Sequence, residues 1–553
     1  MGTTDSMGVR DEVRAMLTGP GSPFELVEEI VLGERMQVFA KRVRTLRELV
    51  GNAAGQFGDR EFLVLDDQRL TFGDFERQVA SAAAWMAAEG IGHGDRVAIL
   101  SANRPEWVVT CFAAMSLGGI VAAFNGRWTT DEITYAIELT EPALLVGDRR
   151  RLERLEGVDH GVRTIVIEDE FDVLRSNAGD VPLPAGPLAE DDPCLILFTS
   201  GTTGRSKGAV ISHRGLIGFV QTTFANAAER RVIAERRGDP VGPTAERSVT
   251  LGTSPLFHVS GFHGQVMINL FTGGTIVYRS GRFDPEDVLA IIEREGITAF
   301  TPLGDMGPRV IDHPRFADYD TSSVVNVGFG GAPASPAIQQ RMRAAFPRAA
   351  ANVGMGYGSS ESTAVLTSIG GQDYLERPES CGQTVIGTEV EVRGPDGTAL
   401  PPGVEGEIFV RSPYNMLEYW RNPDATAETL QSGRWLAMGD VGKWDDDGFL
   451  YINSRARDMI LRNAENIYPI EIEYRLDEHP DVAEAAVTGI DHPEWGQEVR
   501  AVVVPREGTA PTAEELSDWC GQTLAAYKVP TSWEIRDAPL PRNAAGKVVK
   551  KDL

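Results

Sequence analysis

The stretch ILFTSGTTGRSKGAVISH, residues 196–213, sets a run of small hydroxyl residues and glycines between an apolar segment and a helical pattern. The apolar run CLILF at 194–198 predicts a buried strand. After the loop, Ser212 stands where a helix cap is expected, before apolar residues at spacings of three and four. These residues are Leu216, Ile217, Val220, Phe224 and Ala227. A strand, a glycine-rich loop and a helix are therefore expected in that order.

The composition of this loop suits a polyphosphate, because small residues let backbone N–H groups point at an anion and hydroxyls with one lysine add donors. It is not the commonest phosphate loop, GxxxxGK followed by Ser or Thr. Counted from Gly201, Ser206 stands where the second glycine is required and Gly208 where the hydroxyl residue is required. An ordinary P-loop ATPase is therefore disfavoured, and a loop that only connects two elements stays an alternative.

Length and charge limit the classes of protein to consider. A chain of 553 residues is too long for one core, because single cores stop growing near roughly 250 to 300 residues. The 53 basic and 80 acidic residues give a formal net charge of −27, which argues against a nucleic-acid surface. An anionic ligand must therefore meet local cations, such as Lys207 or the C-terminal lysines.

Other sequence signals favour a cytoplasmic location. No apolar run approaches the roughly 18 residues of a transmembrane helix, and the N-terminus has no basic, apolar leader. The four cysteines lie far apart without metal-ligand spacing, so neither a disulfide framework nor a zinc site is expected: Cys111, Cys194, Cys381 and Cys520.

The order of elements predicts an α/β fold. Helical spacing alternates with short apolar runs such as RVAIL at 96–100 and ALLVG at 143–147, which favours parallel strands. The charged, Pro- and Gly-containing latter half of 226–247 is expected to be a surface excursion. Asp447-Gly448 indicates a hairpin. After it, two strand patterns and a helix opening with a Thr512/Glu515 capping box predict a small α+β or α/β unit.

The loop TSGTTGRSKG closely resembles the signature loop of the adenylate-forming superfamily, which includes acyl-CoA synthetases, luciferases and peptide-synthetase adenylation domains. The resemblance extends over nearly the whole chain, and each further motif is weak alone but strong in combination. In family order these motifs are PLFHVSG at Pro255, GGAP at Gly330, GYGSSE at Gly356, MGD at Met438, SRARDMILRNAENIYPIEIE at Ser454 and PRNAAGKVVK at Pro541.

The resemblance implies a fold and a reaction. The fold is a large N-terminal domain of layered sheets and helices, residues 1–454, a hinge at 455–458, and a small mobile α+β lid at 459–553. The reaction joins a carboxylate to the α-phosphate of ATP, giving acyl-adenylate and pyrophosphate, and then passes the acyl group to a thiol. Because two anions must meet, cations and oriented donors have to stabilise the transition state.

The resemblance also implies roles for single residues. Lys547 is the first-choice catalytic residue, Glu361 the metal-associated acid for Mg²⁺, His258 a gate beside the acyl site in place of the aspartate of amino-acid-activating relatives, and Arg457 the hinge residue. The nucleotide would be bound by Thr199, Ser200, Gly201, Thr202, Thr203, Gly204, Lys207, Gly331, Ala332, Pro333, Tyr357, Gly358, Ser360, Asp440 and Arg455, with Ala464 near the thiol channel. The acyl wall would comprise Gly328, Phe329, Gly330 and Gly356 beside His258.

The sequence departs from the family pattern at several positions. Ser206 replaces the usual Pro, Ser360 the usual Thr, and Met438 the usual Thr before GD. Asn463 and Ala464 stand where many acyl-CoA ligases have two glycines, and their side chains could narrow the thiol channel. Adenylation is therefore better supported than CoA transfer.

These observations predict a cytoplasmic, Mg-ATP-dependent, AMP-forming acyl-CoA ligase for a hydrophobic carboxylic acid, with a fatty acid ahead of aryl or alicyclic acids. ATP, Mg²⁺ and coenzyme A are the expected cofactors. An adenylating enzyme that loads a separate carrier protein and a nucleotide-binding protein without turnover remain as alternatives. The sequence leaves the oligomeric state open, with a homodimer among the choices.

Overall fold

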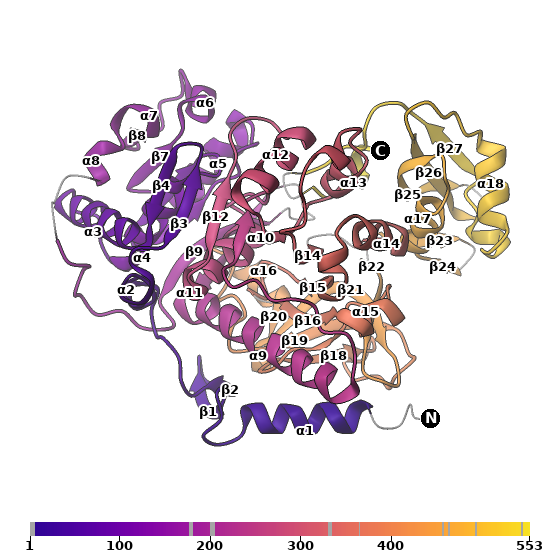
Figure 1. The fold of residues 1–553 in the computed structure, drawn as a ribbon, viewed down its shortest axis with the longest axis horizontal. Helices are drawn as coiled ribbons and strands as arrows, with labels where there is room; N and C mark the ends of the chain where they lie inside the picture. The colour runs from indigo at the N-terminus through magenta and orange to yellow at the C-terminus, as the bar shows by residue number, and fades with distance from the viewer. Residues whose placement is uncertain are drawn as a thin grey trace.

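Two sheets of mainly parallel strands form the larger part of the molecule in the computed structural model (Figure 1). The described residues are 6–175, 181–199, 205–329, 334–363, 365–455, 458–462, 465–492, 495–543 and 546–553. Within these residues, no helix combines the length and the apolar character needed to cross a bilayer.

The first sheet has six strands in the order β10-β9-β6-β5-β7-β8. Every neighbouring pair is parallel except β10 and β9. The inner strands are almost wholly apolar and buried, as expected when helices cover both faces of a parallel sheet. The strands are β5 (Arg96–Leu100), β6 (Ile120–Ala123), β7 (Leu144–Gly147), β8 (Thr164–Val166), β9 (Pro193–Thr199) and β10 (Lys207–Ser212).

The second sheet has nine strands in the order β17-β16-β15-β14-β13-β11-β12-β3-β4. Its centre is parallel, and the antiparallel strands β16, β17 and β4 lie at its two edges. The strands are β3 (Glu61–Leu65), β4 (Gln68–Thr71), β11 (Val249–Leu251), β12 (Thr275–Tyr278), β13 (Ala299–Phe300), β14 (Asn326–Phe329), β15 (Gly354–Gly358), β16 (Val365–Gly370) and β17 (Gln383–Thr384).

Helices fill the space around and between these sheets. Every residue of α4 (Pro105–Ser116) is buried, and α4 contacts strands of both sheets. The long α9 (His213–Arg237) runs against the second sheet at β16. The others are α2 (Leu46–Phe57), α3 (Phe72–Ala88), α5 (Thr130–Thr140), α6 (Arg149–Leu152), α7 (Ile167–Glu170), α8 (Asp172–Arg175), α10 (Val259–Gly261), α11 (Ile268–Thr272), α12 (Pro285–Glu295), α13 (Met306–Ile311), α14 (Pro336–Ala345), α15 (Gly371–Glu376) and α16 (Pro423–Thr429), with the π-helical turn η2 (Phe262–Met267).

A third, antiparallel sheet ends the larger part of the chain. Its strands are β18 (Glu389–Arg393), β19 (Gly406–Arg411), β20 (Leu430–Gln431), β21 (Trp435–Trp444) and β22 (Leu450–Arg455). The predicted Asp447-Gly448 turn joins β21 to β22, and Gly448 has the positive φ of 74° that such a turn requires.

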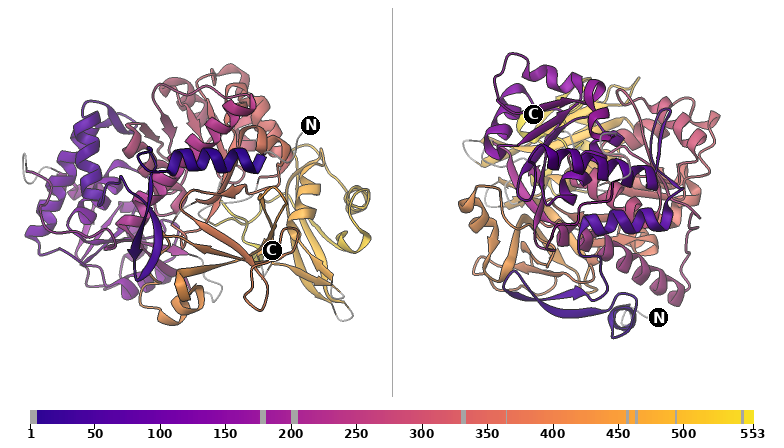
Figure 2. Two further views of the ribbon diagram at one scale, coloured as in Figure 1. Left: turned by 90° about the horizontal axis from the view of Figure 1, so that it is seen from below. Right: turned by 90° about the vertical axis from the view of Figure 1, so that its left-hand side faces the viewer.

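The C-terminal unit has its own sheet and its own core, built around Ile460, Leu476, Val487 and Leu516. It lies at one end of the molecule, with β7 and β8 at the other (Figures 1 and 2). The predicted Thr512/Glu515 capping box is present. The elements are β23 (Ile460–Arg462), β24 (Glu465–Ile467), β25 (Val482–His492), β26 (Gly496–Pro505), β27 (Ser532–Ile535), α17 (Pro469–Asp477) and α18 (Ala513–Gly521). The hinge at 455–458 stays a prediction.

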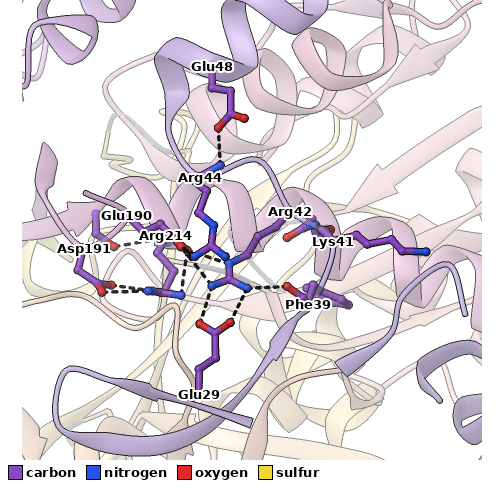
Figure 3. Close-up of polar contacts among 12 residues, drawn as sticks. Glu29, Phe39, Lys41, Arg42, Arg44, Glu48, Glu190, Asp191 and Arg214 are labelled. Carbon is purple, nitrogen blue, oxygen red and sulfur yellow. Dashed lines mark hydrogen bonds and ion pairs between the residues drawn. The ribbon is translucent and has the colours of Figure 1, made fainter. Parts of the chain in front are cut away.

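An N-terminal segment lies on the outside of the larger part (Figures 1 and 2). It comprises α1 (Ser6–Thr18), which packs on α9, and the hairpin of β1 (Leu26–Val31) and β2 (Glu34–Phe39). Arg42 fastens the hairpin to the core, because its guanidinium binds Glu29 at 2.7 Å and Glu190 at 2.8 Å (Figure 3). The Arg42 side chain is only 3% exposed.

The region of the opening loop differs from the sequence prediction in one respect. Lys207–Ser212 forms strand β10, antiparallel to β9, so the helix does not follow the loop directly. The predicted cap is confirmed, because Ser212 Oγ accepts the Gly215 N–H at 3.1 Å. The run from Gly208 to Ile211 is buried in the sheet, and this burial explains why it is extended.

Candidate active site

A large cleft of about 3150 Å³ lies between the larger part of the molecule and the C-terminal unit. Its walls contain most of the described residues that the sequence singles out. These are Thr199, Lys207, His258, Phe329, Gly356, Tyr357, Gly358, Ser360, Glu361, Asp440 and Lys547. Residues from distant motifs are therefore gathered around one space.

On one side of the cleft, Lys207 and Glu361 are joined through Tyr419. Lys207 begins β10, opposite Thr199 at the end of β9, and its Nζ lies 5.1 Å from the centre of the Tyr419 ring. The Tyr419 hydroxyl donates to Glu361 Oε1 at 2.8 Å. Burial and the Glu361 charge raise the pKa of Tyr419, so the phenol keeps the proton that it donates. This group combines one cation, one carboxylate and one hydroxyl.

A second polar pair joins the second sheet to the third. The Tyr357 hydroxyl donates to Asp440 Oδ2 at 2.6 Å, which joins β15 to β21. In the register of the sheet, Asp440 lies opposite Arg455. Ser360 is buried in the cleft wall and Gly358 is exposed. An aromatic ring and a carboxylate thus lie together, as an adenosine site requires.

His258 lies where a neutral imidazole is favoured. It caps α10, with Nδ1 accepting the Ser260 N–H at 3.2 Å, so the ring proton of the neutral form is on Nε2. Burial, together with the positive charge of Lys547, lowers the pKa of His258 to about 4. His258 is therefore neutral near pH 7, and Lys547 lies within electrostatic range of it.

The Lys547 segment is held in place by contacts on both sides of the cleft. Asn543 makes two hydrogen bonds to the Lys547 backbone. The Asn543 N–H donates to the Lys547 carbonyl at 2.9 Å, and the Asn543 Oδ1 accepts the Lys547 N–H at 3.0 Å. Arg127 of the larger part donates to the Asn543 carbonyl at 3.1 Å. The Gly546 carbonyl packs closely on Gly304 of the larger part, because a Cβ added at Gly304 would lie 2.8 Å from the Gly546 carbonyl oxygen. The C-terminal unit therefore presents Lys547 to the cleft.

The predicted acyl wall is only partly in the cleft. Phe329 and Gly356 line it, and Gly356 packs so closely that a Cβ would come within 2.9 Å of Val365. Gly328 is not among the residues that line the cleft, and its Cβ position faces Thr301 Oγ1 at 2.9 Å. Gly328 therefore permits close packing of β14 on Thr301, which itself lines the cleft, and the wall role of Gly328 stays a prediction.

Several predicted residues lie outside the described part of the chain: Ser200, Gly201, Thr202, Thr203, Gly204, Gly330, Gly331, Ala332, Pro333, Arg457, Asn463 and Ala464. The Arg455 backbone is described as part of β22. The roles assigned to all of these residues remain predictions.

Two features of the cleft were missed by sequence reasoning. Tyr419, which links Lys207 to Glu361, lies outside every recognised motif. Asp477 of α17 is hydrogen-bonded to Ser335, which caps α14, and burial raises the pKa of Asp477 to about 7. Both act through partners far away in the sequence, so no local signal could have identified them.

Comparison with known proteins assigns the chain to a family. The family model described as AMP-binding enzyme matches residues 50–420, and that described as AMP-binding enzyme C-terminal domain matches residues 471–547. The chain belongs to the AMP-binding enzyme family. This result confirms the family, the α/β fold class and the enzyme class predicted from the sequence.

Relatives of this AMP-binding enzyme include CoA ligases. Feruloyl-CoA synthase of Amycolatopsis sp is 34% identical over 488 residues, which are 88% of this chain and 93% of the relative. Indoleacetate–CoA ligase of Aromatoleum aromaticum is 31% identical over 518 residues, which are 92% of this chain and 97% of the relative. The similarity thus extends over nearly the full length of both proteins.

A solved structure of similar fold is o-succinylbenzoate CoA synthetase from Bacillus subtilis, in complex with an acyl-adenylate intermediate. It is 28% identical, covers 91% of this chain and 97% of its own, and has a TM-score of 0.76. The same synthetase in complex with ATP and magnesium ion is also 28% identical, with a TM-score of 0.75 over 91% of this chain and 98% of its own. The α/β architecture of this AMP-binding enzyme is therefore that of an acyl-CoA synthetase.

Proposed function

We propose that this enzyme activates an aromatic or cyclic carboxylic acid with ATP and transfers the acyl group to coenzyme A. The main support for this proposal is that one cleft is lined by Lys547, by His258 and by the linked group of Lys207, Tyr419 and Glu361. That cleft offers cations for a triphosphate and an adjoining neutral surface for an acid.

The choice of acid differs from the fatty acid preferred on sequence grounds. The two relatives with the higher identity carry the names of feruloyl and indoleacetate enzymes, whereas a long-chain-fatty-acid ligase of Bacillus subtilis is 27% identical over 92% of this chain and 94% of its own. His258 is neutral and supplies no fixed anion for an α-ammonium group. These facts support a hydrophobic acid with a ring, and a fatty acid is the second candidate.

The first half-reaction is a nucleophilic substitution at phosphorus, in which one anion attacks another. A carboxylate oxygen of the acid forms a bond to the α-phosphorus of ATP, and the bond from that phosphorus to the bridging oxygen breaks, so pyrophosphate leaves. Lys547 neutralises the charge that accumulates on the α-phosphate and the carboxylate. His258 donates its Nε2–H to an oxygen of the acid, since Nδ1 is occupied by Ser260.

The nucleotide is oriented by residues on the two flanks of the cleft. Lys207 and the loop that precedes it bind the β- and γ-phosphates, and Asp440 accepts hydrogen bonds from the ribose hydroxyls. Tyr357 lies beside the adenine and fixes Asp440 through its 2.6 Å hydrogen bond. Holding the triphosphate in line with the acid supplies a large share of the rate enhancement.

The residues present fit a magnesium ion. Glu361 lines the cleft, and among the described residues its one hydrogen-bonded carboxylate oxygen is Oε1, held by Tyr419, so Oε2 can face an ion. In the described chain no three acidic, histidine or cysteine side chains form a metal cluster, as expected when Mg²⁺ takes one carboxylate and relies on substrate phosphates. When bound, Mg²⁺ would neutralise charge on the triphosphate.

The second half-reaction breaks the acyl-adenylate. The thiolate of coenzyme A attacks the acyl carbonyl, a thioester forms, and AMP leaves with the electron pair of the broken bond. We propose that the C-terminal unit turns about Arg457 between the two steps, withdrawing Lys547 and bringing the Ala464 segment to the thiol passage.

Pyrophosphate release from ATP is the measurement that tests this function. Aromatic, alicyclic and fatty acids are each supplied with and without CoA. Acid-dependent release that becomes multiple-turnover with CoA supports the ligase, and the fastest acid names the substrate class. Release limited to about one equivalent, with or without CoA, would instead favour a carrier protein as acceptor. No release with any acid would leave only a nucleotide-binding protein.

Replacement of Lys547 separates the two half-reactions. Lys547→Ala is expected to lower adenylation by about 100-fold or more, because a charge facing the transition state is lost. Thioester formation from supplied acyl-adenylate should change little. The exposed Lys41→Ala, outside the cleft, serves as the matched control. Equal loss of both half-reactions in Lys547→Ala would contradict the role given to this lysine.

A further inference from the structure

One face of α9 extends the cleft away from Lys547. Residues at helical spacing on this face line the same space: Phe219, Thr223, Ala227, Arg230, Ala234 and Arg237. The first three are apolar or small, and the fourth is a guanidinium. An acid lying along α9 therefore passes apolar surface before it meets Arg230.

Arg230 is a cation without an acidic partner. Its Nη1 donates to Ser368 Oγ at 2.6 Å, and in the described part of the chain no ion pair joins it to a carboxylate. Burial lowers the pKa of Arg230, and the charges of Glu229 and Asp373 oppose this shift without cancelling it. Arginine cannot lose its proton in a protein, so the charge persists.

The nearby acids are engaged elsewhere. Glu229 accepts Arg10 at 3.2 Å and Arg14 at 2.8 Å, both from α1. Asp373 accepts Arg237 at 2.9 Å. The N-terminal helix α1, which precedes the segment matched by the family model, thus pairs with the acid next to Arg230. Glu229 and Asp373 act on Arg230 only at longer range, and in the described chain neither forms an ion pair with it.

Arg230 lies close to the predicted acyl wall. Its partner Ser368 is on β16, directly opposite Gly356 of β15. Gly370 is the next residue on that face, and its Cβ position is 3.8 Å from Arg230 Nε. Because Gly370 carries no side chain, it does not cover the Arg230 guanidinium, and Val365 borders the space above Gly356. Opposite residues of antiparallel strands are only about 5 Å apart at Cα, so a compact acid can reach both.

We propose that Arg230 binds a second carboxylate, at the end of the acid remote from the one that is activated, so that the preferred substrate is a compact cyclic dicarboxylic acid. This inference rests on the proposed function of the cleft. A carboxylate can accept hydrogen bonds from two N–H groups of a guanidinium. It would thereby replace the water that burial removes from the charge. A long alkyl chain would instead cover the charge with hydrocarbon, which is unfavourable.

The test compares each aromatic diacid with its monomethyl ester, which has nearly the same shape and one reactive carboxylate but no distal charge. The wild-type enzyme should prefer the best diacid by at least about 30-fold in kcat/KM, the effect typical of pairing a buried charge. Arg230→Met and Arg230→Gln should abolish or reverse this preference and retain activity on the monoester. Arg236→Met is the matched control, because Arg236 is on α9, pairs with Glu12 at 3.3 Å and does not line the cleft.

Two results would overturn the inference: no preference of the wild type for any diacid, or the same preference in Arg230→Met. Calorimetric binding of the same pairs provides a readout without turnover. Arg230-dependent binding of the diacid with no pyrophosphate release would support this subsite and overturn the proposed function. Pyrophosphate release with monoacids and no Arg230-dependent selectivity would support the function and overturn the subsite.

Discussion

Helix α9 carries two arginines that differ in their partners, the buried Arg214 and the half-buried Arg230. Arg214, in the first turn, donates to Asp191 at 2.6 and 2.9 Å and lies 3.0 Å from Glu190, while Arg42 binds Glu190 from the other side (Figure 3). Arg230, four turns later, has the Ser368 hydroxyl as its one hydrogen-bond partner among the described residues. Arg214 is compensated within the fold, and we infer that Arg230 is compensated by a ligand. The same residue type on one helix therefore serves stability at one end and recognition at the other.

The largest effect is expected from breaking the compensated cluster. Arg42→Ala leaves Glu29 without its guanidinium partner and removes one cation from the buried Glu190, so the unfolding free energy should fall by about 3 kcal/mol or more. Denaturant unfolding measures this change. The exposed pair of Arg35 and Glu28 is the control, and Arg35→Ala should cost less than about 1 kcal/mol. Equal losses in both variants would remove the distinction between buried and exposed pairs.

A buried histidine extends the comparison of charged groups with and without a carboxylate partner. Unlike arginine, histidine can lose its proton when no carboxylate pairs with it. Burial lowers the pKa of His263 to about 3, below the ordinary 6.5. The unfolded chain therefore binds a proton below about pH 6.5 that the folded chain excludes, and stability falls as pH drops from 6.5 toward 3. Each pH unit in this range should cost on the order of 1 kcal/mol.

His263→Leu should reduce this loss of stability, measured as thermal unfolding between pH 7.5 and 5. Within the described residues, neither ring nitrogen of His263 has a hydrogen-bond partner, and its ring packs against Phe219 and Phe262, so an apolar replacement suits the site. The exposed His93→Gln is the control. An unchanged pH slope in His263→Leu would mean that other groups cause the acid sensitivity.

The smallest effect on stability is expected at Arg230. Arg230→Met removes a partly desolvated charge that forms no ion pair in the described part of the chain, so the unfolding free energy should stay the same or rise by about 1 kcal/mol. The Arg236→Met control should stay within about 0.5 kcal/mol of the wild type. A loss of unfolding free energy in Arg230→Met as large as that in Arg42→Ala would mean that Arg230 stabilises the fold. The distinction between Arg214 and Arg230 would then be wrong.

Sequence patterns predicted local features well. The Ser212 cap, the Asp447-Gly448 turn and the Thr512/Glu515 capping box are all present, because each depends on residues within a few positions of one another. Strand β10 was missed, because four apolar residues before a helical pattern do not reveal whether a neighbouring strand will pair with them.

The candidate site divides in the same way. Contiguous motifs named Lys547, Glu361 and Asp440, and these lie in one cleft. The motifs could not show that Tyr419 joins Lys207 to Glu361, because Tyr419 and Glu361 are 58 positions apart and come into contact only when the chain folds. Gly328 was assigned to the acyl wall because it neighbours a motif, and only the folded chain shows that its Cβ position faces Thr301.

The sequence by itself determined the family, the α/β class and the kind of reaction, because phosphate-binding loops and catalytic motifs are contiguous and need particular residues at fixed spacing. Only the tertiary structure decided which charges are compensated. Arg214 and Arg230 look alike in the sequence, and whether a carboxylate meets each one depends on chain segments that are brought together from far away. Burial then fixes the consequence, since a charge removed from water requires a partner from the protein or from its ligand.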